Sequence, residues 1–141
     1  MNREGCAENL RQIGQGILLY ANDHGGAFPD SFQTILADEN VLPICFVCPA
    51  TSDARASGPT TRAVAQDLVG GGHLSYVYVG RELTNNTSDA KTVVVFEPFS
   101  NHGNGMNVLF GDGHVEFVDA NRGARIAAEA AAGVRPIVIR Q

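Results

Sequence analysis

The sequence predicts an α+β fold in which one long N-terminal amphipathic helix packs on a small antiparallel β-sheet. An apolar stripe with helical spacing runs from about residue 4 to residue 24, whereas the chain after Gly26 is patterned mostly as short strands. The Asp112–Gly113 pair between two apolar runs is typical of a β-hairpin. We expect residues 1–141 to form a single domain, since this length supports one hydrophobic core.

The N-terminal helix is predicted because apolar residues recur over residues 4–24 at steps of three and four. We expect it to end at His24-Gly25-Gly26, where glycine accepts a left-handed backbone conformation. The residues that define the buried stripe are Cys6, Leu10, Ile13, Ile17 and Tyr20.

A second, short helix is predicted after Phe28-Pro29, with Asp30 or Ser31 as its cap and its end between residues 38 and 40. Residues 41–49 contain two prolines and are expected to form an edge segment or an extended loop. Residues 50–72 are rich in small and polar residues. We interpret them as a long surface excursion with a helical turn over residues 62–68.

The expected sheet region spans residues 73–118, with strands at residues 73–79 and 92–96 and a hairpin over residues 107–118. A two-residue type I′ turn at Asp112–Gly113 would pair Phe110 with Val115 on the apolar face, which should meet the long helix. The other pairs of that register are Val108–Phe117, and Leu109–Glu116 on the opposite face.

Residues 119–141 are predicted as a C-terminal helix and tail. An Ala-rich helix over residues 121–132 would be capped by Asn121 and ended by Gly133. Residues 134–139 would then return as an edge strand interrupted by Pro136.

The charge pattern bears on possible partners. A net charge of −5 with scattered Lys and Arg argues against nucleic acid or an anionic membrane surface. No window approaches the roughly 18 apolar residues of a membrane span, and no signal-peptide pattern precedes the helix.

The three cysteines, Cys6, Cys45 and Cys48, leave several chemistries open. Cys45 and Cys48 have the spacing of half a zinc site or of a redox pair, but a zinc site would also need Cys6 or a distant His. Pro49 and the apolar neighbours suit structural thiols or one bridge better. Among the possible disulfide bridges we favour Cys6–Cys48, which would attach the helix to the following loop and close a long stretch of chain.

His102 and Asp112 could form a His–carboxylate pair, a cation site or a hydrolytic pair. The simpler hypothesis is that Asp112 is a turn residue and that His102 fixes the loop at residues 100–105. A calcium site is an alternative, because Glu97 and Asp112 lie among several asparagines that also offer oxygen ligands. The sequence contains no nucleophile elbow, phosphate loop or paired catalytic carboxylates.

Two stretches together carry a resemblance to a known family. The N-terminal segment reads CAENLRQIG at residues 6–14, YAND at residues 20–23 and GAFP at residues 26–29. The second stretch is His102 followed, after nine residues, by Asp112–Gly113; Cys48–Pro49 and Ser75–Tyr76 add to it. In this combination and order the chain resembles type IV pilin-like and type II secretion pseudopilin-like proteins of planctomycetes and their relatives. It is especially similar to those with the prepilin-type processing-associated H-X9-DG domain.

The resemblance implies a non-enzymatic structural subunit of a pilus-like or pseudopilus assembly, periplasmic or extracellular, with other pilin or pseudopilin subunits as partners. Its motif residues would be Cys6, Cys48, His102, Asp112 and Gly113. Such proteins open with an apolar membrane half-helix of roughly twenty residues, which this sequence lacks. We therefore expect the chain to be the soluble head, monomeric or weakly associating by itself, and anchored in the inner membrane only if such a half-helix lies upstream.

Two other functions compete with this expectation. One is a small metal- or thiol-dependent enzyme or redox module that uses Cys6, Cys45, Cys48 and a histidine. The other is a surface adhesion or glycan-binding module, suggested only by the Gly- and Asn-rich loops. The resemblance implies no cofactor, with calcium as the alternative above.

Overall fold

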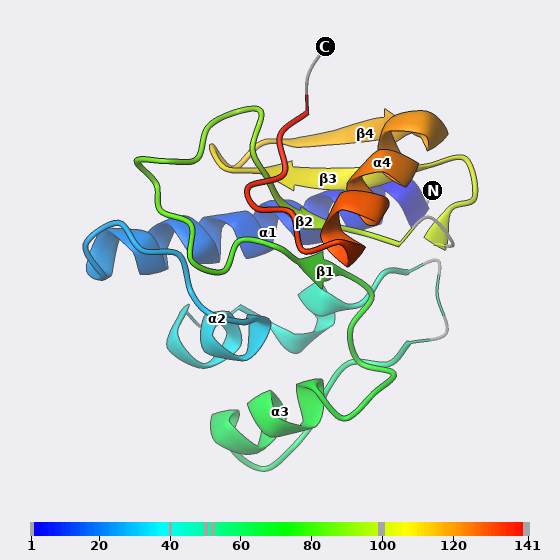
Figure 1. Cartoon of the computed structure of the whole chain (residues 1–141). Helices are drawn as coiled ribbons and strands as arrows, with labels where there is room; N and C mark the ends of the chain where they lie inside the picture. The colour runs from blue at the N-terminus through cyan, green and yellow to red at the C-terminus, as the bar shows by residue number, and fades with distance from the viewer. Residues whose placement is uncertain (1, 40, 50, 52, 99–100, 140–141) are drawn as a thin grey trace.

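A computed structural model describes residues 2–39, 41–49, 51, 53–98 and 101–139. Helices lie on both faces of one four-stranded antiparallel sheet of order β1-β2-β3-β4, which confirms the α+β class (Figure 1). The elements are α1 (Asn2–Asp23), α2 (Phe32–Glu39), η1 (Pro43–Phe46), α3 (Thr61–Leu68), β1 (Val77–Tyr78), β2 (Val93–Phe96), β3 (Gly105–Phe110), β4 (Val115–Asp119) and α4 (Ala120–Ala131).

The long N-terminal helix is confirmed as α1, which packs along one face of the sheet. Its stripe is buried at Cys6, Leu10, Ile13 and Ile17. Tyr20, predicted as part of that stripe, is only half-buried and stacks on the ring of His24 at the end of the helix. At Gly14 a side chain would collide with Leu109 of β3, so glycine lets the helix approach the sheet closely. The helix ends as expected, because Gly25 and Gly26 have positive φ and the Gly26 N–H donates to the Ala21 carbonyl.

The β3–β4 hairpin forms, but its predicted turn and register are wrong. Asp112 does not have the positive φ that a type I′ turn requires; only Gly113 does, at +92°. The Gly113 N–H donates to the Phe110 carbonyl, and the Phe110 N–H donates to the His114 carbonyl. The connection is therefore a three-residue loop, residues 111–113, with glycine in the left-handed position.

The extra loop residue shifts the pairing by one, so the side chains of β3 lie on the faces opposite to those predicted, while Val115 of β4 lies on the predicted face. Leu109 pairs with Val115, and both pack on the α1 side, whereas Val108 pairs with Glu116. Val108 and Phe110, which were expected to meet the long helix, lie instead in the core beneath α4. The sheet thus separates two hydrophobic cores.

The segment between α1 and the sheet contributes more to the core than expected. Helix α2 forms as predicted, with the Thr34 N–H donating to Ser31; residue 40 lies outside the described residues. In place of an extended edge, residues 43–46 form a 3-10 turn. Residues 50–72 are mostly exposed, and the predicted helical turn forms as α3; residues 50 and 52 lie outside the described residues. The segment is nevertheless more than a surface excursion, because Ala56, Ala65 and Leu68 join the α1 core.

The remaining differences have local causes. The expected strand at residues 73–79 is reduced to β1, because Ser75 donates its N–H to the Phe46 carbonyl outside the sheet. Asp119, not Asn121, caps α4 by accepting from the Arg122 N–H. The tail does not form a full strand; Thr92 and Val138 form an isolated bridge beside β2.

Candidate functional site

The region with the greatest chemical content lies where the beginning of α1 meets the end of β2. Cys6 of α1 forms a disulfide with Cys48, which follows η1, across 42 residues of sequence. This confirms the expected pairing, and it joins the helix to the loop beneath it. Cys45 is free and buried, and burial raises the pKa of its thiol.

Beside the bridge lies Glu97, whose side chain is 0% exposed. Its Oε2 accepts two hydrogen bonds of 2.7 Å from Asn107 of β3, one from the backbone N–H and one from Nδ2. Its Oε1 accepts from Asn101 Nδ2 at 3.3 Å, and the same amide group donates to the Ser75 carbonyl. A buried carboxylate is thus held in one orientation by its neighbours.

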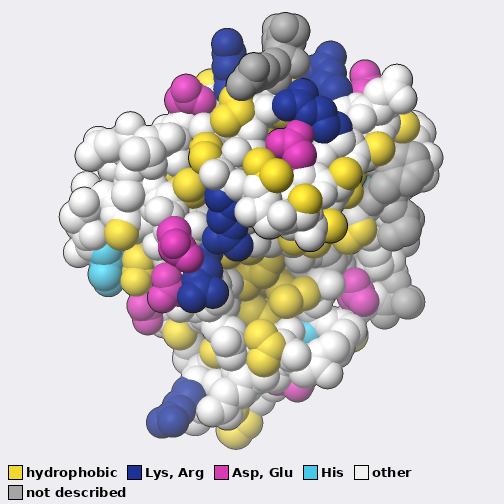
Figure 2. Space-filling model, in the orientation of Figure 1, with side chains coloured by type: hydrophobic (Ala, Val, Ile, Leu, Met, Phe, Trp, Pro, Cys, Tyr) yellow, Lys and Arg dark blue, Asp and Glu magenta, His cyan; other side chains and the backbone are white. Residues whose placement is uncertain are grey.

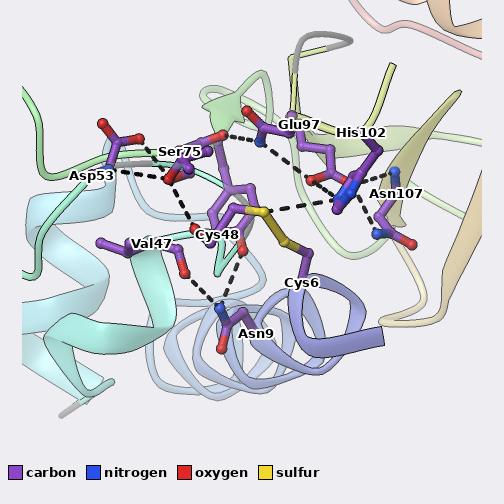
Figure 3. The surroundings of a disulfide bond; sticks show 12 residues. Cys6, Asn9, Val47, Cys48, Asp53, Ser75, Glu97, His102 and Asn107 are labelled. Atoms are coloured by element: carbon purple, nitrogen blue, oxygen red, sulfur yellow. Dashed lines mark hydrogen bonds and ion pairs between the residues drawn. A yellow bond between two sulfur atoms is a disulfide. The ribbon is translucent and has the colours of Figure 1, made fainter. Parts of the chain in front are cut away.

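His102 connects this carboxylate to the disulfide. Its Nε2 lies 2.9 Å from Glu97 Oε1 and 3.8 Å from Cys48 Sγ (Figure 3). The His102 ring also meets Phe117 edge to face. A 2.9 Å contact between these atoms requires one proton between them. The side chain of His102 is only 8% exposed, so water has little access to the pair.

This arrangement does not form a nucleophile–base–carboxylate relay. In such a relay the histidine contacts the nucleophile through one ring nitrogen and the carboxylate through the other. Here Cys48 and Glu97 both approach Nε2 of His102, and Cys48 is also bonded to Cys6. The geometry instead directs several possible metal ligands toward one point.

Other positions that carried the family resemblance fold around the same cluster (Figure 3). The Ser75 hydroxyl donates to Asp53 at 2.7 Å, while Asn9 of α1 donates to the Val47 carbonyl at 2.8 Å. Asn9 also donates to the Tyr76 hydroxyl. Desolvation of that phenol raises the pKa of Tyr76, so Tyr76 remains a neutral hydrogen-bonding group in the core.

The structure does not pair His102 with Asp112. Asp112 lies in the hairpin loop, where its Oδ1 accepts from the backbone N–H of His114 and also contacts the His114 ring. The other ring nitrogen of His114 lies 3.2 Å from Glu116. Asp112 is thus a turn residue, as the simpler hypothesis holds, while the closest hydrogen-bond partner of His102 among the described residues is the Glu97 side chain.

The sequence-derived ligand candidates are distributed differently from expectation. Among the described residues, the one cluster with suitable geometry joins Cys6, Cys48, Glu97 and His102, and leaves out Cys45 and Asp112. Sequence reasoning named Glu97 only for calcium and did not connect it to His102. The available signal was a carboxylate directly after an all-apolar strand, which is unusual unless the carboxylate is paired.

Comparison of the chain with protein-family models, with curated proteins and with solved structures finds no match.

Proposed function

We propose that this chain is the head of a structural subunit in a pilus-like or type II secretion pseudopilus assembly. The observation that carries the proposal is the 22-residue helix α1 packed along an antiparallel sheet, and two of the resemblance motifs, residues 6–14 and 20–23, lie on this helix. A helix fixed in this way can carry a head domain on a helical stem. Among the described residues, no helix is long and apolar enough to cross a membrane.

A hollow beside α1 offers a surface for a neighbouring subunit. It is lined partly by Leu19, Val41 and Leu42, and two of these are unusually exposed for leucine, Leu19 at 56% and Leu42 at 65%. Exposed apolar side chains that are grouped in this way are typical of interaction surfaces. We assign this hollow to contacts between copies of the subunit.

The molecular surface exposes charges of both signs. On the face seen in Figure 2, acidic and basic side chains lie next to each other, with hydrophobic side chains exposed between them. Mixed charge of this kind sets the register between protein partners.

The experiment compares two matched substitutions in cells that produce the whole native protein. Leu19→Glu places a charge on the hollow, while Val69→Glu changes a residue that is equally exposed, at 59%, but follows α3. Both positions are at the surface, so each change should alter the free energy of unfolding by less than about 0.5 kcal/mol. Fibres recovered by shearing and ultracentrifugation are probed by immunoblotting.

We expect Leu19→Glu to remove the protein from the fibre fraction and Val69→Glu to leave it there. Recovery of both variants in fibres would disprove the role of the hollow. If the unmodified protein never enters a fibre or membrane-associated assembly, the proposed function itself is wrong.

A further inference from the structure

Four side chains from distant parts of the chain bring two sulfurs, one imidazole nitrogen and one carboxylate oxygen within 4.8 Å of one another. They belong to Cys6 of α1, Cys48 after η1, Glu97 after β2 and His102 of the next loop. We propose that reduction of the Cys6–Cys48 bridge converts this cluster into a closed, tetrahedral zinc site. This inference is independent of the proposed assembly function.

The disulfide by itself does not explain the cluster. A disulfide needs no charged neighbours, and a carboxylate with 0% exposure is costly to bury for structural reasons alone. Nevertheless Glu97 and His102 are both aimed at the sulfurs, with His102 Nε2 at 3.8 Å from Cys48 Sγ. A reduced state of the bridge, in which all four side chains bind one cation, explains why both Glu97 and His102 are buried beside the sulfurs.

The change from disulfide to zinc site consists of a two-electron reduction followed by metal binding. A dithiol reductant gives two electrons to the bridge, so the S–S bond breaks, two protein thiols form and the reductant closes its own disulfide. Zinc then binds both sulfurs as thiolates and releases the two thiol protons to solvent. The proton between Glu97 Oε1 and His102 Nε2 moves to His102 Nδ1 or to solvent, and zinc takes its place.

The spacing of the ligand atoms is close to what zinc requires. Zinc–sulfur bonds of about 2.3 Å and zinc–nitrogen or zinc–oxygen bonds of about 2.0 Å give tetrahedral edges of about 3.8 Å for S–S, 3.5 Å for S–N and 3.3 Å for N–O. The structure has 3.8 Å between Cys48 Sγ and His102 Nε2, and 2.9 Å between His102 Nε2 and Glu97 Oε1. Once unbonded, the two sulfurs need only separate by a side-chain rotation.

The surrounding hydrogen bonds already orient the ligands. Asn107 donates twice to Glu97 Oε2, which leaves Oε1 directed at the sulfurs and the imidazole. Phe117 meets the His102 ring edge to face and limits its rotation. Outer partners of this kind are typical of protein metal sites.

The donor set selects the ion. Two thiolates and an imidazole favour zinc over calcium or magnesium, which prefer six or more oxygen ligands. All four donors are protein groups, and Cys6, Cys48 and Glu97 are fully buried, so no position remains for a reacting water. The site is therefore structural rather than hydrolytic.

The test measures metal binding by the full chain after reduction and anaerobic removal of the reductant. Zinc affinity is measured by competition with a chromophoric chelator, and cobalt serves as a spectroscopic substitute. We expect one ion per reduced chain, with the visible bands of tetrahedral cobalt and a thiolate-to-cobalt charge-transfer band. The oxidised chain should show neither.

The variants identify the ligands. Asn107→Ala removes an outer partner and should weaken zinc binding roughly 10- to 100-fold. Glu97→Gln and His102→Gln remove ligands, and each should weaken zinc binding by more than that. Cys45→Ser is the matched control, since Cys45 is buried nearby but outside the cluster, and it should bind like the parent. Equal affinity in the parent, Glu97→Gln and His102→Gln would overturn the proposal.

The reduced chain must also be followed by circular dichroism, because loss of the bridge can unfold it. If it unfolds, stoichiometric zinc should restore the helical signal in the parent and in Cys45→Ser, but not in His102→Gln. Failure of zinc to restore the parent fold, or equal recovery in His102→Gln, would likewise overturn the proposal.

Discussion

Two histidine–carboxylate pairs lie at opposite ends of the β3–β4 hairpin, and they differ in nearly every physical respect. His102 and Glu97, near the open end, have side chains only 8% and 0% exposed. His114 and Asp112, at the turn, have side chains 37% and 45% exposed. Each pair joins an imidazole to a carboxylate, so the difference in exposure arises from where the fold places them.

The buried pair depends on its surroundings, whereas the exposed pair does not. Glu97 cannot exchange its partners for water, so every donor around it must stay in place. Water can replace either partner of His114, and solvent screens their charges. The first region should therefore respond strongly to small chemical changes, and the second should tolerate them.

The largest expected effect is the loss of the bridge in the buried region. Cys6→Ala together with Cys48→Ala removes a closure of 42 residues, which should cost about 4 kcal/mol through the entropy of the unfolded chain. For a chain of this size that corresponds to a fall in Tm of roughly 10–15 °C. Calorimetry under non-reducing conditions measures it.

The matched control is Cys45→Ala, which shortens a buried side chain and keeps the bridge. It should cost no more than about 1 kcal/mol, typical of a small change in a core. Equal losses in the double variant and in the control would mean that the bridge contributes little in solution.

The second prediction contrasts the two regions directly. Glu97→Gln replaces a buried acceptor with an amide whose N–H₂ group faces the donors of Asn107 or His102. One unsatisfied buried donor should cost about 1–3 kcal/mol. Glu116→Gln makes the same chemical change beside exposed His114 and should stay within about 0.5 kcal/mol. Urea unfolding of both variants gives the comparison, and similar losses in the two would contradict it.

The third prediction concerns the backbone of the turn region. Gly113 has a φ of +92°, and a Cβ there would lie 3.0 Å from Leu18 Cδ1 of α1. Gly113→Val should therefore cost about 1–2 kcal/mol from the left-handed conformation alone, and more from the contact. Gly25→Val is the control, because Gly25 also has positive φ but has nothing within 4 Å. A Tm for Gly113→Val at or above that of the control would show that the contact with α1 adds nothing.

Local sequence patterns predict the elements of this fold better than they predict how the elements pack. The long helix follows from local periodicity, and the long loop that it closes favours the Cys6–Cys48 bridge over other pairings. The sequence also predicts the hairpin, but Gly111-Asp112-Gly113 is compatible with either a two- or a three-residue loop. The choice rests on packing, since the observed register places Leu109 and Val115 against α1.

The buried cluster was out of reach for a different reason. Glu97 and His102 are five residues apart, a spacing that carries no structural signal outside a helix. Their contact depends on Asn107 of the neighbouring strand and on Cys48, which is 54 residues from His102. Only the assembled sheet brings these groups together, so local patterns identified the candidates but not their arrangement.

The smallest expected effect is the pH dependence of the exposed pair. Partial burial acts to lower the pKa of His114, but hydrogen bonds to Asp112 and Glu116 outweigh it and raise that pKa above 6.5. Partial burial acts to raise the pKa of Asp112, but the bonds from His114 hold it below 3.8. Folding thus favours the charged form of both side chains, the His114 cation and the Asp112 anion.

The sign of the dependence follows from these directions. The raised pKa of His114 contributes stability that is complete below pH 6.5 and is lost as the pH rises through the raised value. The lowered pKa of Asp112 contributes stability that is lost only as the pH falls below 3.8. His114→Gln should therefore lower the Tm more at about pH 5 than at about pH 9. Because the pair is exposed, we expect a difference of only a few tenths of a kcal/mol, or roughly 1 °C in Tm. High salt should reduce that difference. An equal loss of Tm at the two pH values, or a larger loss at pH 9, would mean that the contacts of His114 do not favour its charged form in solution.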